Sequence, residues 1–273
     1  MSIASASAIA PDNKSRLPLK QRLGQGEICT GTFMIFLAGG DFAQFLAARG
    51  LDFFYLCMEH SAFDMSLARE TIMGARASGI APLVRVAQAE YHLIARVLDI
   101  GAEGIVLPRV ETPEEAERLV KYSTYAPAGL RGISTVGGHA DYAPIKDVPA
   151  FLAGRDRDIL RIIQIETSLG FERREEILSV PRIDVCLIGT GDLAMNMGLA
   201  GQPDHPAVLE AAEKVYEVCR KRNVIFTLPL RKPEDVRRWQ QTGMNMLSLA
   251  TDAVFLTMGI SQFLAQVERP AAR

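Results

Sequence analysis

The chain of 273 residues is 48% hydrophobic and 23% charged, which is ordinary for a globular protein in water and does not fit a disordered or collagen-like chain. Its 30 lysines and arginines face 32 aspartates and glutamates, so the net charge is -2 and the isoelectric point lies near pH 6.1. This balance excludes the basic field that attracts nucleic acid or an anionic membrane surface. A small molecule is therefore the expected partner.

The sequence predicts neither an exported nor a membrane protein. The first 15 residues lack the basic start and unbroken apolar stretch of an export signal, and the longest apolar runs fall far short of the roughly 20 residues that a membrane helix needs. The cysteines are widely spaced, without the close pairs of a zinc ribbon or the density of a disulfide scaffold, at Cys29, Cys57, Cys186 and Cys219. We expect reduced thiols and a cytoplasmic location.

Short β-like runs alternate with longer stretches of helical periodicity, the pattern of parallel strands joined by crossover helices. The predicted strands cover residues 28–35, 53–58, 82–86, 104–108, 131–134, 160–166, 185–188, 224–228 and 246–249. The fifth of these is the weakest and is set aside, which leaves eight. Helices are predicted at residues 65–78, 91–98, 113–123, 207–221 and 233–242. Asp64 and Thr112 mark two of the helix starts as capping residues.

Eight strand and helix units over about 250 residues predict an α/β protein with the (β/α)8 fold of a TIM barrel. No Gly-x-Gly-x-x-Gly follows the first predicted strand, so a doubly wound dinucleotide-binding sheet is unsupported. No linker rich in proline or serine divides the chain. We expect one barrel domain at residues 17–273 after a flexible tail at 1–16, with a long loop over one barrel face at residues 125–149.

Polar residues at the carboxyl ends of the predicted strands carry the most information, because chemistry in barrels takes place there. The strand at residues 53–58 runs directly into Glu59 and His60, which are either functional or solvated loop residues. Arg85, near the end of the following strand, must be paired. It either belongs to a structural ion pair or is a fixed cation that stabilises an anionic oxygen.

Two acidic residues follow later strands. Alternation along residues 160–166 puts Gln164 and Glu166 on one face, and a buried carboxylate requires a metal ion or a basic partner. The next strand ends at Gly189 and leads through Gly191 to Asp192, which either caps a helix or holds a cation while backbone amides hold a substrate anion. Together the two acids suit Mg2+ or Mn2+ with open positions for water and substrate.

Several motifs occur in a recognisable order along the chain. They are Glu-His at 59–60, Val-Arg-Val at 84–86, Leu-Asp-Ile-Gly-Ala at 98–102, Pro-Arg-Val-Glu-Thr-Pro-Glu-Glu-Ala at 108–116, Tyr-Ala-Pro-Ala-Gly-Leu-Arg-Gly at 125–132, Gln-Ile-Glu-Thr at 164–167, Ile-Gly-Thr-Gly-Asp-Leu at 188–193 and Gly-Gln-Pro-Asp-His-Pro at 201–206. In this order they resemble the HpcH/HpaI aldolase family from about Gly31 to Phe263.

The resemblance implies a metal-dependent class II pyruvate aldolase, a carbon–carbon lyase that cleaves or forms 4-hydroxy-2-oxo acids through a pyruvate enolate. The products of cleavage are pyruvate and an aldehyde or ketone. By motif, His60 is similar to the family's catalytic base and Arg85 to its transition-state stabiliser. Asp99 matches the residue that raises the basicity of the histidine, although it falls at the end of a helix that returns to the opposite barrel face, which suggests action across an interface.

The resemblance also implies ligands and partners. Glu166 and Asp192 match the ligands of a divalent metal ion, Mg2+ or Mn2+ with Co2+ as a further option, and Gln164 with the amides of Gly191 and Asp192 matches the pyruvate site. Family members are typically oligomers, so we expect a homo-oligomer, a hexamer or a trimer. The alternatives are another enolate-forming lyase, such as an acyl-CoA lyase or an oxaloacetate decarboxylase, or a pyruvate-binding barrel with weak catalysis.

The chain departs from the family pattern at three places. Cys57 stands where the family's Asp-x-Glu-His carries its aspartate, which removes a charge expected near the waters of the metal. Thr190-Gly191 replaces the Pro and Ala or Ser of the family's glycine loop and adds a hydroxyl group. Residues 136–141 lack the basic pattern that usually follows Arg-Gly, so a different acceptor pocket is expected.

Overall fold

The computed structural model describes residues 17–267 and places nine parallel strands in one sheet, in the order β7-β6-β5-β4-β3-β2-β1-β9-β8. The strands are β1 (Cys29–Met34), β2 (Phe53–Cys57), β3 (Ala81–Arg85), β4 (Gly104–Leu107), β5 (Leu160–Ile165), β6 (Val185–Ile188), β7 (Ile225–Thr227), β8 (Pro229–Leu230) and β9 (Met246–Thr251). The sheet is a nearly closed barrel, which confirms the predicted α/β barrel. The predicted tail at 1–16 lies outside the described residues.

Two short strands share the last position of the barrel. β7 pairs with β6 and β8 pairs with β9, and only Leu228 separates the two strands. The prediction of a strand at residues 224–228 is therefore confirmed for β7. It missed β8, because this strand begins with Pro229 and proline is unusual inside a strand. Residues 131–134 form no strand and contribute only a bridge between Arg131 and Tyr125.

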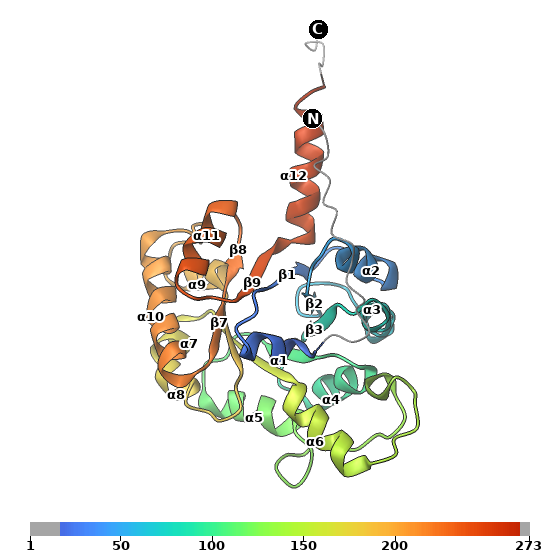
Figure 1. The fold of residues 1–273 in the computed structure, drawn as a ribbon. Coiled ribbons are helices and arrows are strands. Elements are labelled where there is room, and N and C mark those ends of the chain that lie inside the picture. The colour runs from blue at the N-terminus through green and yellow to red at the C-terminus, as the bar shows by residue number, and fades with distance from the viewer. Residues whose placement is uncertain (1–16, 268–273) are drawn as a thin grey trace.

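Helices surround the barrel (Figure 1). They are α1 (Leu19–Gly24), α2 (Gly40–Ala48), α3 (Met65–Ser78), α4 (Tyr91–Ile100), α5 (Pro113–Ser123), α6 (Val148–Asp158), α7 (Ser168–Glu172), α8 (Arg174–Ile177), α9 (Thr190–Asn196), α10 (Pro206–Arg222), α11 (Pro233–Gln241) and α12 (Asp252–Leu264), with a 3-10 turn η2 at Gly138–Ala140. The Asp64 side chain accepts a hydrogen bond from the Leu67 amide, and Thr112 forms a capping box with Glu115, so both predicted starts are confirmed.

Alternation along the strands separates two apolar layers. Ile163 and Ile165 of β5 face the helices, whereas Leu160 and Ile162 belong to the cluster inside the barrel. The same period of two turns Gln164 and then Glu166, just past the strand end, toward the interior. Cys57 and Arg85 follow the interior positions of β2 and β3 in the same way, so the side chains of all four residues meet at the carboxyl end of the barrel.

The predicted long loop at residues 125–149 packs at the other end of the molecule. Its turn η2 contacts the end of α4, where His139 Nδ1 lies 2.9 Å from the carbonyl oxygen of Asp99, and Asp141 pairs with Arg76 at 2.6 Å. Because α4 runs back along the strands, this end of α4 lies at the amino end of the barrel. Within one chain, residues 136–141 therefore do not shape the cavity at the carboxyl ends of the strands.

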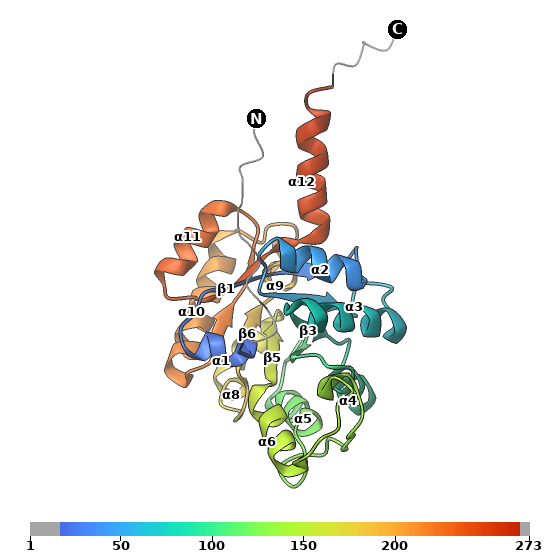
Figure 2. The ribbon, with the colours of Figure 1, turned by 45° about the vertical axis from the view of Figure 1, so that its right-hand side comes forward.

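α12 projects away from the barrel instead of packing along it (Figures 1 and 2). Its base is fixed because the Asp252 carboxylate accepts hydrogen bonds from the amides of Ile35, Phe36 and Leu37, at 2.7 to 3.2 Å. Beyond this buried first residue, the helix exposes a series of large apolar side chains at Val254, Phe255, Leu256, Met258, Ile260, Phe263 and Leu264. Across residues 17–267, none of the helices combines the length and apolarity needed to cross a membrane.

Candidate active site

A cavity of about 180 Å³ opens at the carboxyl end of the barrel. Five of the residues selected from the sequence line it, which are His60, Arg85, Gln164, Gly191 and Asp192. Glu166 lies directly behind Gly189, another lining residue. The structure therefore brings together the predicted metal, substrate and catalytic residues, with the exception of Asp99.

Arg85 is held by four neighbours and is almost fully buried. Its Nη2 donates to the Cys57 sulfur at 3.0 Å and its Nη1 to Gln164 Oε1 at 3.4 Å. Its Nε lies 3.3 Å from Glu59 Oε2, and its guanidinium carbon lies 5.3 Å from the centre of the Phe33 ring. These contacts fix the guanidinium group at the cavity, so the ion pair is confirmed, and the stabilisation of an anionic oxygen by Arg85 stays a prediction.

Glu59 is the acidic residue that the sequence left without a role. Its side chain is only 12% exposed, and Oε2 lies 3.5 Å from His60 Nε2 as well as 3.3 Å from Arg85 Nε. The His60 side chain is 55% exposed at the mouth, and the His60 amide donates to the Cys57 sulfur at 3.3 Å. Glu59 therefore links His60 to Arg85. Its position in the sequence, directly after a buried strand and before a histidine, is the feature from which its role could have been predicted.

Glu166 is 2% exposed and has no salt bridge within residues 17–267. Its Oε1 accepts a hydrogen bond from the Arg109 amide at 2.9 Å, and its Oε2 accepts one from the Gln164 side-chain amide. Burial, followed by the negative charge of Asp192, raises the pKa of Glu166 to about 7. The sequence left a metal ion and a basic side chain open as partners of Glu166. No basic side chain forms a salt bridge with Glu166 in the described structure, and the nearby Arg85 pairs with Glu59 instead.

Asp192 lies in the first turn of α9 but does not cap it. The N-cap position belongs to Gly189, and no side-chain capping bond forms there. A Cβ at Gly189 would overlap the Glu166 carboxylate and lie 2.7 Å from Gln164 Nε2, so only glycine fits beside the buried acid. Within residues 17–267 no group of three His, Cys, Asp or Glu side chains that could hold a metal ion forms, so Glu166 and Asp192 are a pair of candidate ligands only.

Arg231 is a lining residue that the sequence did not single out. It directly follows β8, and its Nη1 donates to Thr190 Oγ1 at 2.8 Å. Burial lowers the pKa of its guanidinium group. The strand before it is only two residues long, so no periodicity marked Arg231 as lying at a strand end.

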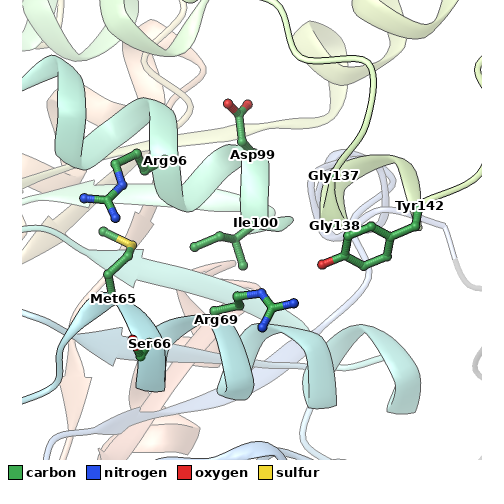
Figure 3. A pocket seen from close by; sticks show the side chains of 9 residues that line it. All are labelled: Met65, Ser66, Arg69, Arg96, Asp99, Ile100, Gly137, Gly138 and Tyr142. Atoms are coloured by element: carbon green, nitrogen blue, oxygen red, sulfur yellow. The ribbon is translucent and has the colours of Figure 1, made fainter.

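Asp99 lies elsewhere, at the amino end of the barrel. Its carboxylate, 35% exposed, accepts a hydrogen bond from Arg131 Nη2 at 2.8 Å. It borders a second pocket of about 400 Å³ between α3 and α4, where Figure 3 shows the carboxylate directed away from Arg69 on α3. Asp99 is not among the residues that line the His60 cavity. Within one chain it therefore has no contact with the base candidate.

A parallel barrel with carboxylates, an arginine and a histidine at the carboxyl ends of its strands defines an enzyme. Residues 32–257 match the HpcH/HpaI aldolase/citrate lyase family, so the chain belongs to this family. The membership confirms the resemblance and the class of enzyme, a carbon–carbon lyase of the aldolase type.

Similar proteins agree in sequence and in fold. The chain is 30% identical to a hydroxypyruvate/pyruvate aldolase of Roseovarius nubinhibens over 87% of its own length and 96% of that protein. It is 31% identical to a 5-keto-4-deoxy-D-glucarate aldolase of Salmonella arizonae, with coverages of 77% and 80%. The crystal structure of an HpcH/HpaI aldolase from Desulfitobacterium hafniense superposes with a TM-score of 0.89 at 28% identity, covering 94% of this chain and all of that one.

Proposed function

We propose that the protein is a divalent-metal-dependent aldolase that cleaves or forms 4-hydroxy-2-oxo acids through a pyruvate enolate. One observation carries the proposal: the buried carboxylate of Glu166, which forms no salt bridge within residues 17–267, lies behind the wall of a cavity that Asp192, a fixed arginine and a half-exposed histidine line. The printed names of two relatives, a hydroxypyruvate/pyruvate aldolase and a 5-keto-4-deoxy-D-glucarate aldolase, support this choice of chemistry.

Glu166 and Asp192 would hold the metal ion. Their mutual repulsion contributes to the raised pKa of Glu166, and a cation between them removes that repulsion. Two carboxylates with open positions suit the hard ions Mg2+ and Mn2+, with Co2+ as a further candidate. When bound, such an ion polarises the keto group of the substrate and stabilises negative charge on its oxygen.

The remaining steps belong to side chains of the chain itself. The amides of Gly191 and Asp192, together with Gln164, would hold the substrate carboxylate and keto group beside Arg85. In cleavage, His60 accepts the proton of the C4 hydroxyl group while the electrons of the C3–C4 bond pass to the enolate, and the aldehyde or ketone leaves. Arg85, fixed in advance by its neighbours, stabilises the enolate oxygen, and protonation at C3 gives pyruvate.

Glu59 and Asp99 would act on His60 from different chains. Glu59 Oε2 lies 3.5 Å from His60 Nε2, where it would orient the imidazole ring at the cavity. Asp99 lies at the amino end of its own barrel, so its proposed contact is with His60 of another copy. Its partial exposure leaves one side of the carboxylate open for such a contact.

We also propose that the protein is a homo-oligomer, a trimer or a hexamer, in the cytoplasm. The apolar side chains of α12 line a groove of about 720 Å³ together with Phe42, Phe45 and Leu46 of α2. A helix with so many exposed apolar residues is stabilised when α12 of a second copy covers it. All four cysteines are free thiols, in keeping with a reducing compartment.

Proton exchange at the methyl group of pyruvate in heavy water tests the proposed function, because it requires the metal, the base and the substrate together. We expect exchange with Mn2+, none after chelation, and a loss of at least about 100-fold in His60→Ala, the range of general-base effects. A His92→Ala variant serves as control, since His92 lies exposed on α4 and away from the cavity. Exchange that persists after removal of all metal would contradict the proposal.

A further inference from the structure

Within residues 17–267, Arg231 is a cation without an acidic partner, and it lies in the wall of the active-site cavity. Its side chain is partly buried, and its only hydrogen bond within residues 17–267 goes to Thr190 Oγ1, at 2.8 Å. Asp204 and Asp235 favour its charged form only from a distance, and Asp204 is itself bound by Lys232 at 2.8 Å. The guanidinium group therefore carries an uncompensated charge at the cavity.

The free part of this guanidinium group faces the first turn of α9. Nη2 lies 3.8 Å from the position that a Cβ on Gly191 would occupy, so the guanidinium overhangs this glycine, and the missing side chain leaves the space between them open. Nη1 is occupied by Thr190, which leaves Nη2 and Nε for a ligand. Arg231 and Arg85 line the same cavity, and in the part of the chain that the structure describes Arg85 pairs with Glu59 whereas Arg231 forms no salt bridge.

A desolvated cation is costly unless an anion compensates it. Burial lowers the pKa of Arg231, and its guanidinium group lines the cavity with Thr190 as its hydrogen-bond partner, so an anionic ligand in the cavity would compensate its charge. A guanidinium group matches a carboxylate, because its planar N–H donors align with the two oxygens. Thr190 is fully buried and keeps the arginine over the cavity.

Building on the proposed aldolase function, we propose that Arg231 binds a carboxylate of the substrate and that Thr190 positions it. This gives a role to the hydroxyl group that Thr190 adds to the family's glycine loop. Two sources offer the same chemistry: the carboxylate of the pyruvate part, or a second carboxylate on the aldehyde. The first makes Arg231 a general keto-acid contact, and the second makes the enzyme selective for anionic aldehydes.

Arg231→Met tests the proposal, with Arg237→Met as the matched control because Arg237 is exposed on the neighbouring α11 and does not line the cavity. Glyoxylate and glycolaldehyde are the two acceptors, since one carries a carboxylate where the other carries a hydroxymethyl group. Loss of a charge-assisted hydrogen bond predicts a fall of about 10- to 100-fold in affinity or kcat/KM. A loss with glyoxylate but not glycolaldehyde assigns the aldehyde carboxylate, and a raised KM for pyruvate in proton exchange assigns the pyruvate carboxylate.

Equal effects on both acceptors with an unchanged KM for pyruvate overturn the proposal, as does a fall in kcat alone. Calorimetric titration with pyruvate and with glyoxylate, in the presence of Mn2+, keeps this test separate from the proposed function. If the native protein exchanges no proton, the proposed function fails. The affinities of pyruvate and glyoxylate for Arg231→Met and Arg237→Met then still decide the role of Arg231. Binding of pyruvate or glyoxylate that is about tenfold weaker in Arg231→Met supports the proposal, and equal binding of both acids by the two variants overturns it.

Thr190 is tested as a positioning residue. Thr190→Val removes the hydroxyl group at nearly constant shape, and we expect a several-fold rise in KM for the carboxylate ligand that Arg231 binds. Thr190→Ser keeps the hydroxyl group and is expected to restore the native KM. If serine and valine at this position give the same KM, Thr190 does not position Arg231.

Discussion

Glu166→Gln is expected to stabilise the metal-free protein at neutral and higher pH, although it removes a proposed metal ligand. The pKa of Glu166 rises from 4.5 to about 7 on folding. At 1.36 kcal/mol per pKa unit, ionising this group inside the folded protein costs about 3 kcal/mol. Glu166 is 2% exposed, so solvent does not screen this cost.

The amide in the variant carries a smaller cost of its own. The side-chain oxygen of a glutamine at position 166 can still accept a hydrogen bond from the Arg109 amide. The NH2 group of that glutamine, however, faces the NH2 group of Gln164, and two donors cannot bond to each other, so one of the two side-chain amides must rotate. Subtracting about 1 kcal/mol for this hydrogen bond leaves a net gain of about 2 kcal/mol at pH 8. Because the folded pKa is the higher one, the penalty is absent below pH 4.5 and grows as the pH rises to about 7.

Urea unfolding at pH 5 and pH 8 in the presence of a chelator measures this effect as the difference between variant and native protein. We expect that difference in the free energy of unfolding to shift by about 2.5 kcal/mol in favour of Glu166→Gln between pH 5 and pH 8, because the hydrogen-bond cost of the amide is the same at both pH values. Mn2+ at 1,000 times its Kd stabilises the native protein by about 4 kcal/mol and reverses the order at pH 8. A variant that is less stable than native protein at both pH values without metal would refute an uncompensated Glu166.

Two further predictions concern packing. Gly189→Ala is expected to displace the Glu166 carboxylate, lowering stability by about 2 kcal/mol and Mn2+ affinity at least tenfold, as urea unfolding and calorimetry would measure; Gly154→Ala, in the interior of α6 with open space around it, should raise stability by up to about 1 kcal/mol and leave Mn2+ affinity unchanged. Phe263→Asp on α12, where the side chain is 79% exposed, is expected to shift the protein toward monomers in light scattering. An unchanged mass for Phe263→Asp would count against α12 as the contact.

The strands and the central site residues could be predicted because their signals are local. Apolar runs with a period of two located the strands, and barrel geometry then placed Gln164, Glu166 and Arg85 at one end of the barrel. Arg231 could not be found in this way, because it follows a two-residue strand that begins with proline. Its contact with Thr190 joins residues 41 positions apart, and no periodicity in the sequence reports such a distance.

α12 and Asp99 show the other limit of the sequence. A helix after the last strand fits the barrel pattern, but its apolar residues do not reveal whether the helix packs on its own barrel or projects from it, as the structure has it. The position of Asp99 at the amino end of the barrel could be predicted, because α4 must run back from the end of β3 to the start of β4. Arg131, which holds Asp99 at 2.8 Å, belongs to a loop without periodicity, so this pair could not be predicted.

Charge at the cavity connects the departures from the family pattern. Cys57 accepts a hydrogen bond from Arg85 but carries no compensating charge of the kind an aspartate supplies, so within residues 17–267 Glu59 is the acid that pairs with Arg85. Arg231 adds a second guanidinium group, held there by Thr190. A neutral side chain at Cys57 and the guanidinium group of Arg231 both make the potential at the mouth more positive, which favours the entry of anionic substrates. Cys57 and Arg231 therefore act in the same direction, toward a ligand that brings its own carboxylate.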